Sequence, residues 1–150
     1  MPTSAKSADS LPRFSRAELE ISTSRRAEFV NVTSRLQELA NRSGWTEGTL
    51  TVFVPHTTAG ITIQEGADPD VVHDLLGWLE GAVPWTNPLY RHGEGNTAAH
   101  IKAALMGSSI RCLLEAGRLH LGTWQAIFFC EFDGPRSRRL WVSFEPTSPG

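Results

Sequence analysis

The chain has 150 residues, of which 40% are hydrophobic and 20% charged, and its formal net charge is −2. These values are typical of one globular domain that buries its own core, and they supply no general attraction to nucleic acid or to an anionic membrane. No apolar run reaches the roughly 20 residues that span a bilayer, and the opening residues lack the apolar core of a signal peptide. We therefore expect a cytoplasmic protein that binds neither nucleic acid nor membrane.

Both ends of the chain have the composition of tails. Residues 1–12 are rich in Ser, Ala and Pro, and the chain finishes with "PTSPG". We find no internal repeat and no linker between them. The sequence predicts disordered tails at 1–12 and 146–150 around a single domain at 13–145.

The first half of the domain alternates between strands and a helix. Residues 16–23 alternate as a strand, and residues 31–44 predict a helix whose apolar stripe ends before Gly44. Two apolar runs at 49–54 and 60–64 follow as strands. The polar residues between these two strands place His56 at a strand end, followed by Thr57 and Thr58.

Residues 67–83 give the strongest helix signal in the chain. Asp68 is suited to the N-cap and Pro69 to the first helical position. Helical spacing places Asp74 at the edge of the apolar stripe, where it is a candidate for a functional role, and His73 on the solvated side. The predicted stripe consists of Val71, Val72, Leu75, Leu76 and Leu79.

A second helix and three strands complete the domain. Residues 96–107 predict a helix with Asn96 as N-cap and His100 close to its first turn. Strands are expected at 108–114, 118–132 and 138–144, with a turn at 115–117 and another at "DGPR". Short turns favour antiparallel pairing, so we expect an α+β fold with a mainly antiparallel sheet packed with helices.

The long predicted strand at 118–132 is apolar on both faces. Two faces need two covering layers, so we expect helices on one side and something else, such as a neighbouring subunit, on the other. Gln125 falls in the middle of this strand, where an unpaired amide would cost on the order of 1–3 kcal/mol. The two parity sets are Leu119, Leu121, Thr123, Gln125, Ile127, Phe129 and Glu131, against Trp124, Ala126, Phe128, Cys130 and Phe132.

Three histidines lie at predicted element ends, where a scaffold presents side chains to a cleft: His56, His92 and His100. Glu94 lies between the last two. Imidazole and carboxylate are ligands of Zn and related divalent ions. The spacing matches no established zinc motif, however, and turn glycines, an Asn cap and backbone-bonded histidines would produce the same pattern.

Two further features have competing interpretations. Arg136, Arg138 and Arg139 could bind phosphate bidentately or form a solvated hairpin tip. Cys112 and Cys130 lie in apolar runs without C-x-x-C spacing, and we interpret both as buried free thiols. His120 is interpreted as a structural histidine.

Three stretches together carry a family resemblance: "HTTAGITIQEGADPDVVHDLL", "YRHGEGNTAAHIKAALMGSSI" and "LGTWQAIFFCEFDGPRSRRLWV". In this order and spacing they resemble the YjbQ family of uncharacterised proteins, over residues 14–144. The resemblance implies an α+β fold assembled as a homotrimer with clefts near the subunit contacts. It also implies a low, secondary thiamine phosphate synthase activity, which joins hydroxymethylpyrimidine diphosphate to thiazole phosphate and releases pyrophosphate.

The resemblance also makes specific site residues into candidates. We expect His56, His92 and His100 to hold a divalent ion, Zn or Mg, beside a small phosphorylated or anionic ligand. The other candidates are Glu94, Asp74 and Gln125 for catalysis, and Thr57, Thr58, Asn96 and Arg136 for phosphate binding. A metal-dependent hydrolase of a phosphate ester or amide, and a trimer that binds a small anion without catalysis, remain alternatives.

Overall fold

Eight strands and three helices make up the part of the chain that the computed structural model describes, residues 15–147. The predicted tail at 1–12, and residues 148–150 of the other, lie outside the described residues; Pro146 belongs to the last strand. The elements are β1 (Ser15–Ser22), β2 (Glu28–Asn31), α2 (Thr33–Ser43), β3 (Gly48–Phe53), β4 (Ala59–Glu65), α3 (Pro69–Ala82), α4 (Thr97–Met106), β5 (Ser109–Glu115), β6 (Arg118–His120), β7 (Gln125–Glu131) and β8 (Ser137–Pro146).

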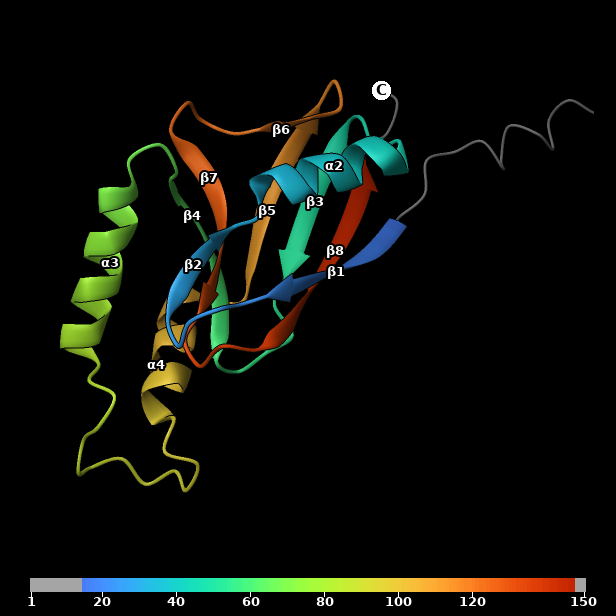
Figure 1. Cartoon of the computed structure of the whole chain (residues 1–150). Helices are drawn as coiled ribbons and strands as arrows, with labels where there is room; N and C mark the ends of the chain where they lie inside the picture. Colours follow the sequence, from blue (N-terminus) through green and yellow to red (C-terminus); the bar gives the residue numbers. More distant parts are fainter. Residues whose placement is uncertain (1–14, 148–150) are drawn as a thin grey trace, which may run out of the picture.

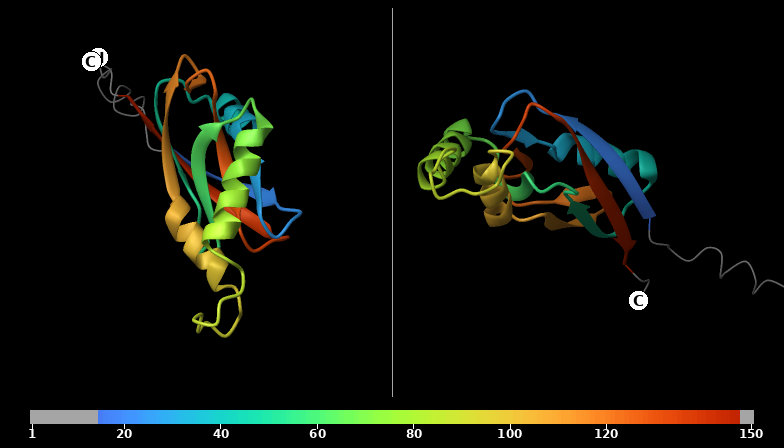
Figure 2. Two further views of the ribbon diagram at one scale, coloured as in Figure 1. Left: turned by 90° about the vertical axis from the view of Figure 1, so that its left-hand side faces the viewer. Right: turned by 90° about the horizontal axis from the view of Figure 1, so that it is seen from below.

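The strands form two antiparallel sheets that face each other (Figure 1). The large sheet has the order β1-β8-β3-β5-β6 and the small sheet the order β2-β7-β4. The main core lies between the two sheets and includes one face of α2. Helices α3 and α4 cover the other face of the small sheet, as the two further views confirm (Figure 2). The predicted α+β fold with antiparallel sheets is therefore confirmed.

Helix α2 follows its predicted stripe. Val32, Leu36, Leu39 and Ala40 are all buried in the main core. Gly44 ends the helix with a φ of 69°, in the left-handed region that favours glycine, and its amide donates to the carbonyls of Ala40 and Asn41.

Helix α3 is less buried than its apolar stripe predicts. Asp68 caps it by accepting a hydrogen bond from the Asp70 amide at 2.9 Å, as expected. Of the five predicted stripe residues, however, only Leu79 is buried, and the others are half-buried. Trp78 is largely exposed. The helix packs against the small sheet through Leu79 and the partly buried Val72.

The predicted strand at 118–132 is two strands in different sheets. Residues 118–120 form β6 at the edge of the large sheet, and Gln125–Glu131 form β7 in the centre of the small one. The "DGPR" turn likewise leads from β7 into the other sheet and does not close a hairpin. The expected pairing of neighbouring strands across these two short connections was therefore wrong, because the chain passes from one sheet to the other at both points.

Strand β7 is apolar on both faces, as its alternation predicts. Ala126, Phe128 and Cys130 face α3 and α4, whereas Ile127 and Phe129 face the large sheet of the same chain. A neighbouring subunit is therefore not needed to cover the second face. The expectation of a second covering layer is confirmed for β7, and that layer is the chain's own large sheet.

Candidate functional site

His92 and His100 lie side by side at the amino-terminal end of α4. Their ring centroids are 5.2 Å apart and the rings are nearly perpendicular, at 85°. With Thr97 they line a small hollow of 180 Å³. The turn at 92–95 brings the two imidazoles together, since the Gly95 amide bonds back to the His92 carbonyl at 3.1 Å and Gly95 has a φ of 75°.

Asn96 stands at the N-cap position of α4 but does not cap the helix with its side chain. It is buried, and its Nδ2 donates to Asp133 Oδ2 at 2.9 Å. Its Oδ1 and the Thr97 hydroxyl are sealed from solvent and have no hydrogen-bond partner within residues 15–147. A buried polar atom without a partner costs about 1–3 kcal/mol, and a ligand or ion would recover this energy only where this end of α4 opened to let it reach the two atoms.

Arg136 is connected to the same end of α4 through Asp133. Its Nη2 donates to Asp133 Oδ2 at 3.0 Å and its Nε to the Asp133 carbonyl at 2.8 Å. Asp133 Oδ2 thus accepts hydrogen bonds from both Asn96 and Arg136. The guanidinium is half-exposed, so it can contribute positive potential to this end of the helix. Its Nε and Nη2 are already bonded to Asp133.

His56 lies in a different hollow and does not join the other two histidines. Its Nε2 accepts a hydrogen bond from the Arg139 amide at 2.9 Å, so the neutral ring carries its proton on Nδ1. Burial, and then the positive charge of Arg138, lower the pKa of His56 below its usual 6.5. Within residues 15–147 no three His, Cys, Asp or Glu side chains converge as a metal site.

Replacing His56 by Gln is expected to flatten the pH dependence of stability. Because the pKa of His56 is lowered in the folded state, the unfolded chain binds more protons between that pKa and 6.5. The contribution of His56 to the stability of the folded state is complete above pH 6.5 and is lost as the pH falls through the folded-state pKa. The glutamine oxygen can still accept from the Arg139 amide but cannot titrate. Urea unfolding midpoints measured across about pH 5 to 8 test this.

His120→Gln is the matched control, because His120 is an exposed imidazole whose Nδ1 lies 3.1 Å from Glu115 Oε2. If the urea midpoint of His56→Gln depends on pH as strongly as that of the wild type, another group causes the dependence.

The three candidate catalytic residues are not assembled around the histidine pair. Glu94 is exposed in the turn between His92 and His100. Asp74 is 80% exposed in the middle of α3 and contacts His73 at 3.1 Å, so its expected position at the edge of a buried stripe was wrong. Gln125 is exposed at the first position of β7, and its Oε1 accepts from the Gly122 amide at 2.8 Å. Its expected burial in mid-strand was wrong because the strand begins there.

A buried ion pair between Glu131 and Arg138 lies between the sheets. Glu131 is 0% exposed and Arg138 is 5% exposed. Arg138 Nε donates to Glu131 Oε1 at 2.8 Å, Nη2 bonds to Glu131 Oε2, and Nη2 also donates to Thr58 Oγ1 at 2.8 Å. Thr58 is therefore an internal partner of Arg138. The interpretation of Arg138 as part of a solvated hairpin tip was wrong.

Strand parity could have found this pair. Arg138 shares its face with Leu140 and Val142, which are both in the core, so alternation places the guanidinium inward. A charged residue at an inward position needs a partner, and Glu131 has the same inward parity as Phe129 on β7.

Lys102 is a second buried charge that the sequence analysis missed. It is 2% exposed, and its Nζ contacts Glu80 Oε1 at 2.7 Å. Glu80 also pairs with Arg26 at 3.4 Å, and the Arg26 guanidinium lies 4.4 Å above the Trp85 ring. This cluster joins α3, α4 and the segment before β2.

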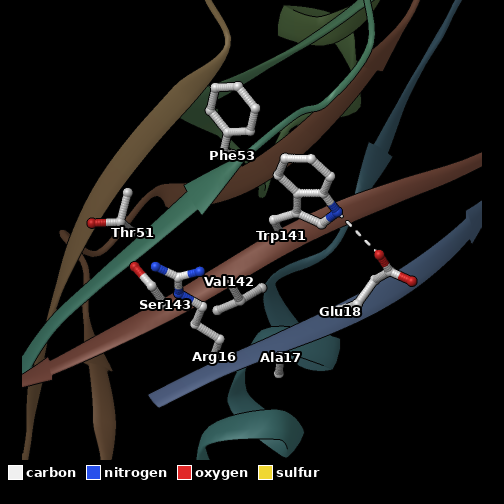
Figure 3. A pocket seen from close by; sticks show the side chains of 8 residues that line it. All are labelled: Arg16, Ala17, Glu18, Thr51, Phe53, Trp141, Val142 and Ser143. Carbon is white, nitrogen blue, oxygen red and sulfur yellow. Dashed lines mark hydrogen bonds between the residues drawn. The ribbon is translucent and has the colours of Figure 1, made fainter. Parts of the chain in front are cut away.

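A hollow of 610 Å³ lies on the outer face of the large sheet. Phe53 and Trp141 stack there with ring centroids 5.7 Å apart, and Trp141 Nε1 donates to Glu18 Oε2 at 3.0 Å (Figure 3). None of the predicted site residues lines it.

The cysteines are buried free thiols, as expected, and burial raises the pKa of both. No helix within residues 15–147 has the length and apolar character to cross a membrane.

The fold and the histidine-bearing end of α4 define a small two-sheet α+β protein. Residues 17–146 match the family described as UPF0047 protein YjbQ-like, and the chain belongs to this family. It is 48% identical over 124 residues to UPF0047 protein YugU of Bacillus subtilis, covering 83% of this chain and 94% of that one.

Solved structures agree with this membership. An uncharacterised YjbQ/UPF0047 family protein of Clostridium acetobutylicum has a TM-score of 0.82 and 48% identity, over 86% of this chain and 99% of that one. A YbjQ-like protein of unknown function from Sulfolobus solfataricus has a TM-score of 0.83 at 28% identity, over 90% and 99%.

Proposed function

We propose that the protein binds a divalent ion and a small phosphorylated ligand at the amino-terminal end of α4, and that this site has a weak thiamine phosphate synthase activity. The observation that carries the proposal is the pair of adjacent imidazoles, His92 and His100, beside two sealed polar atoms that have no partner within residues 15–147. An acceptor such as Asn96 Oδ1 suits a cation or a water bound to it.

The chain's own groups would bind and orient the phosphorylated ligand. The first amides of α4 have no carbonyl partner inside the helix, and the helix dipole adds positive potential there. Arg136 reaches the same region through Asp133. Glu94, in the turn between the histidines, is the nearest acidic group in sequence and would orient a ligand or take up a proton.

The proposed reaction requires no protein nucleophile. The thiazole nitrogen forms a bond to the pyrimidine methylene carbon, and the bond from that carbon to the diphosphate oxygen breaks, which releases pyrophosphate. The role of the site is therefore to hold two substrates in line. A divalent ion held by His92 and His100, with phosphate oxygens and water as further ligands, would neutralise the leaving pyrophosphate.

A homotrimer is part of the same proposal. Large apolar side chains are exposed on both outer layers, including Trp78 and Leu105 on the helical side and Leu113 and Trp141 on the large sheet. Exposed apolar surface of this kind supports an assembly, in which a neighbouring subunit could complete the ligand set.

Binding without catalysis is the second candidate function. It is favoured by the separate positions of Asp74, Gln125 and the histidine pair within residues 15–147. A small anion would then raise the melting temperature without forming any product.

We expect near-stoichiometric divalent metal in protein purified without an affinity tag or chelator, and loss of that metal in His100→Ala. Removing one of two imidazoles takes away half of the protein's contribution to the site. Elemental mass spectrometry of wild type, His100→Ala and the exposed control His120→Ala measures this. Folded wild type that takes up no metal when it is offered would contradict the metal proposal.

The reaction is tested separately with the two phosphorylated substrates and the metal found. Formation of thiamine phosphate and pyrophosphate that is reduced at least tenfold in His92→Ala would support the synthase. A ligand-induced rise in melting temperature without product would support the binding protein.

A further inference from the structure

A second polar hollow lies away from the histidine pair, where β3 ends and β5 and β8 begin. Its volume is 490 Å³, and its polar lining comes from His56, Thr57, Thr58, Ser108 and Arg138. The segment from Phe53 to Thr58 forms one wall. Ser108 forms the opposite wall, tied to the first by the hydrogen bond from the Val54 amide to the Ser108 carbonyl at 2.7 Å. The site is therefore built by three separate stretches of the chain.

Arg138 lines this hollow, and one nitrogen of its guanidinium makes no hydrogen bond with the described residues. Its Nε and Nη2 are occupied by Glu131 and Thr58, which lock the plane of the guanidinium. Its Nη1 makes no hydrogen bond with any described residue, and it is not one of the sealed polar atoms of residues 15–147. Nη1 is thus an accessible donor, held in place by an arginine that is otherwise buried.

Two hydroxyls in the lining of the hollow can act as further donors. The Thr57 and Ser108 side chains are exposed at its rim, and their hydroxyls make no hydrogen bond with the described residues. No carboxylate is among the residues that line the hollow. Glu131 is fully buried behind the guanidinium and is already saturated by Arg138, Thr23 and two backbone amides.

We propose that this hollow binds a small oxyanion whose oxygens accept hydrogen bonds from Arg138 Nη1 and from the hydroxyls of Thr57 and Ser108. A guanidinium fixed by Glu131 and Thr58, beside two hydroxyls that can turn to donate and with no carboxylate in the lining, suits a phosphate or a carboxylate group. A phosphate offers three oxygens to three donors that come from different walls, whereas a carboxylate offers two. The site therefore favours a phosphate monoester over a carboxylate.

The site is independent of the proposed function, because it shares no residue with the hollow at His92 and His100. A purely structural Arg138 would require only the bonds to Glu131 and Thr58. What that role does not explain is the third nitrogen, which makes no hydrogen bond within residues 15–147 and lies on an arginine that lines the same hollow as the hydroxyls of Thr57 and Ser108.

The test is a titration of ¹⁵N-labelled protein with inorganic phosphate, and separately with acetate, at constant ionic strength. The Arg138 Nε–H signal and the amides of residues 56–58 and 108 report binding by NMR. We expect saturable shifts with phosphate, and binding weakened about tenfold in Arg138→Lys, which keeps the charge opposite Glu131 but removes Nη1. Thr57→Val and Ser108→Ala are each expected to weaken binding several-fold.

Two controls separate this site from general electrostatics and from the other hollow. Arg111→Gln removes an exposed positive charge on the large sheet and should leave the phosphate affinity within about twofold. His100→Ala should leave the phosphate-induced shifts of Arg138 and of residues 56–58 and 108 unchanged, because these residues share no lining with the hollow at His100.

Shifts that saturate only with acetate would identify a carboxylate site with the same donors. The proposal is overturned if neither anion gives saturable shifts, or if Thr57→Val and Ser108→Ala, which leave the ion pair intact, bind phosphate as wild type does.

Discussion

Arg138→Met is expected to lower the free energy of unfolding by about 3–5 kcal/mol. The change leaves the Glu131 carboxylate, which is 0% exposed, without its cation. The carboxylate keeps the Thr23 hydroxyl at 2.8 Å and the amides of Phe132 and Asp133 at 3.1 Å. These neutral donors offset only part of the cost of a buried charge. Urea unfolding followed by tryptophan fluorescence measures the loss.

Arg139→Met is the matched control on the same strand. Arg139 points to the exposed outer face and pairs with Glu18 at 3.6 Å, so we expect a change of no more than about 1 kcal/mol. Adding Glu131→Gln to Arg138→Met should recover part of the stability, because it removes the buried charge and keeps an oxygen for the two amides. Equal losses in Arg138→Met and Arg139→Met would contradict this account.

Glu80→Ala is expected to destabilise the protein more than Lys102→Met, although the two residues form one ion pair. Lys102 is 2% exposed, and Glu80 is its only hydrogen-bond partner within residues 15–147. Removing Glu80 leaves a buried ammonium without a counter-charge, which costs about 3–5 kcal/mol. Removing Lys102 leaves Glu80 38% exposed and still paired with Arg26, so Lys102→Met should cost less than about 1 kcal/mol.

The comparison is made by chemical unfolding of the two variants, with Glu38→Ala as the control. Glu38 is an exposed glutamate on α2, and its loss should change stability by less than about 0.5 kcal/mol. A larger loss in Lys102→Met than in Glu80→Ala would show that packing of the lysine chain, and not its charge, stabilises the contact between α3 and α4.

The candidate site was only partly predictable, because local geometry relates residues that are close in the sequence and does not place distant ones. His92 and His100 are eight positions apart around a glycine turn, so local geometry brings them together as expected. His56 is separated from them by one strand and one helix, and it lies in another hollow. The accessible nitrogen of Arg138 could not be predicted, because it depends on how Glu131 and Thr58 occupy the other two.

The sequence by itself determined most elements of this protein, but it missed β2 and did not divide residues 118–132 into β6 and β7. The helical stripe of α2 and the alternation along β7 act through local geometry, since side-chain direction follows from the backbone period alone. The tertiary structure decided which layer covers each apolar face. It placed β7 and β8 in different sheets and covered the second face of β7 with the chain's own large sheet. It also decided which charges are buried, because Lys102 and Arg138 enter the core only where a carboxylate from another element meets them.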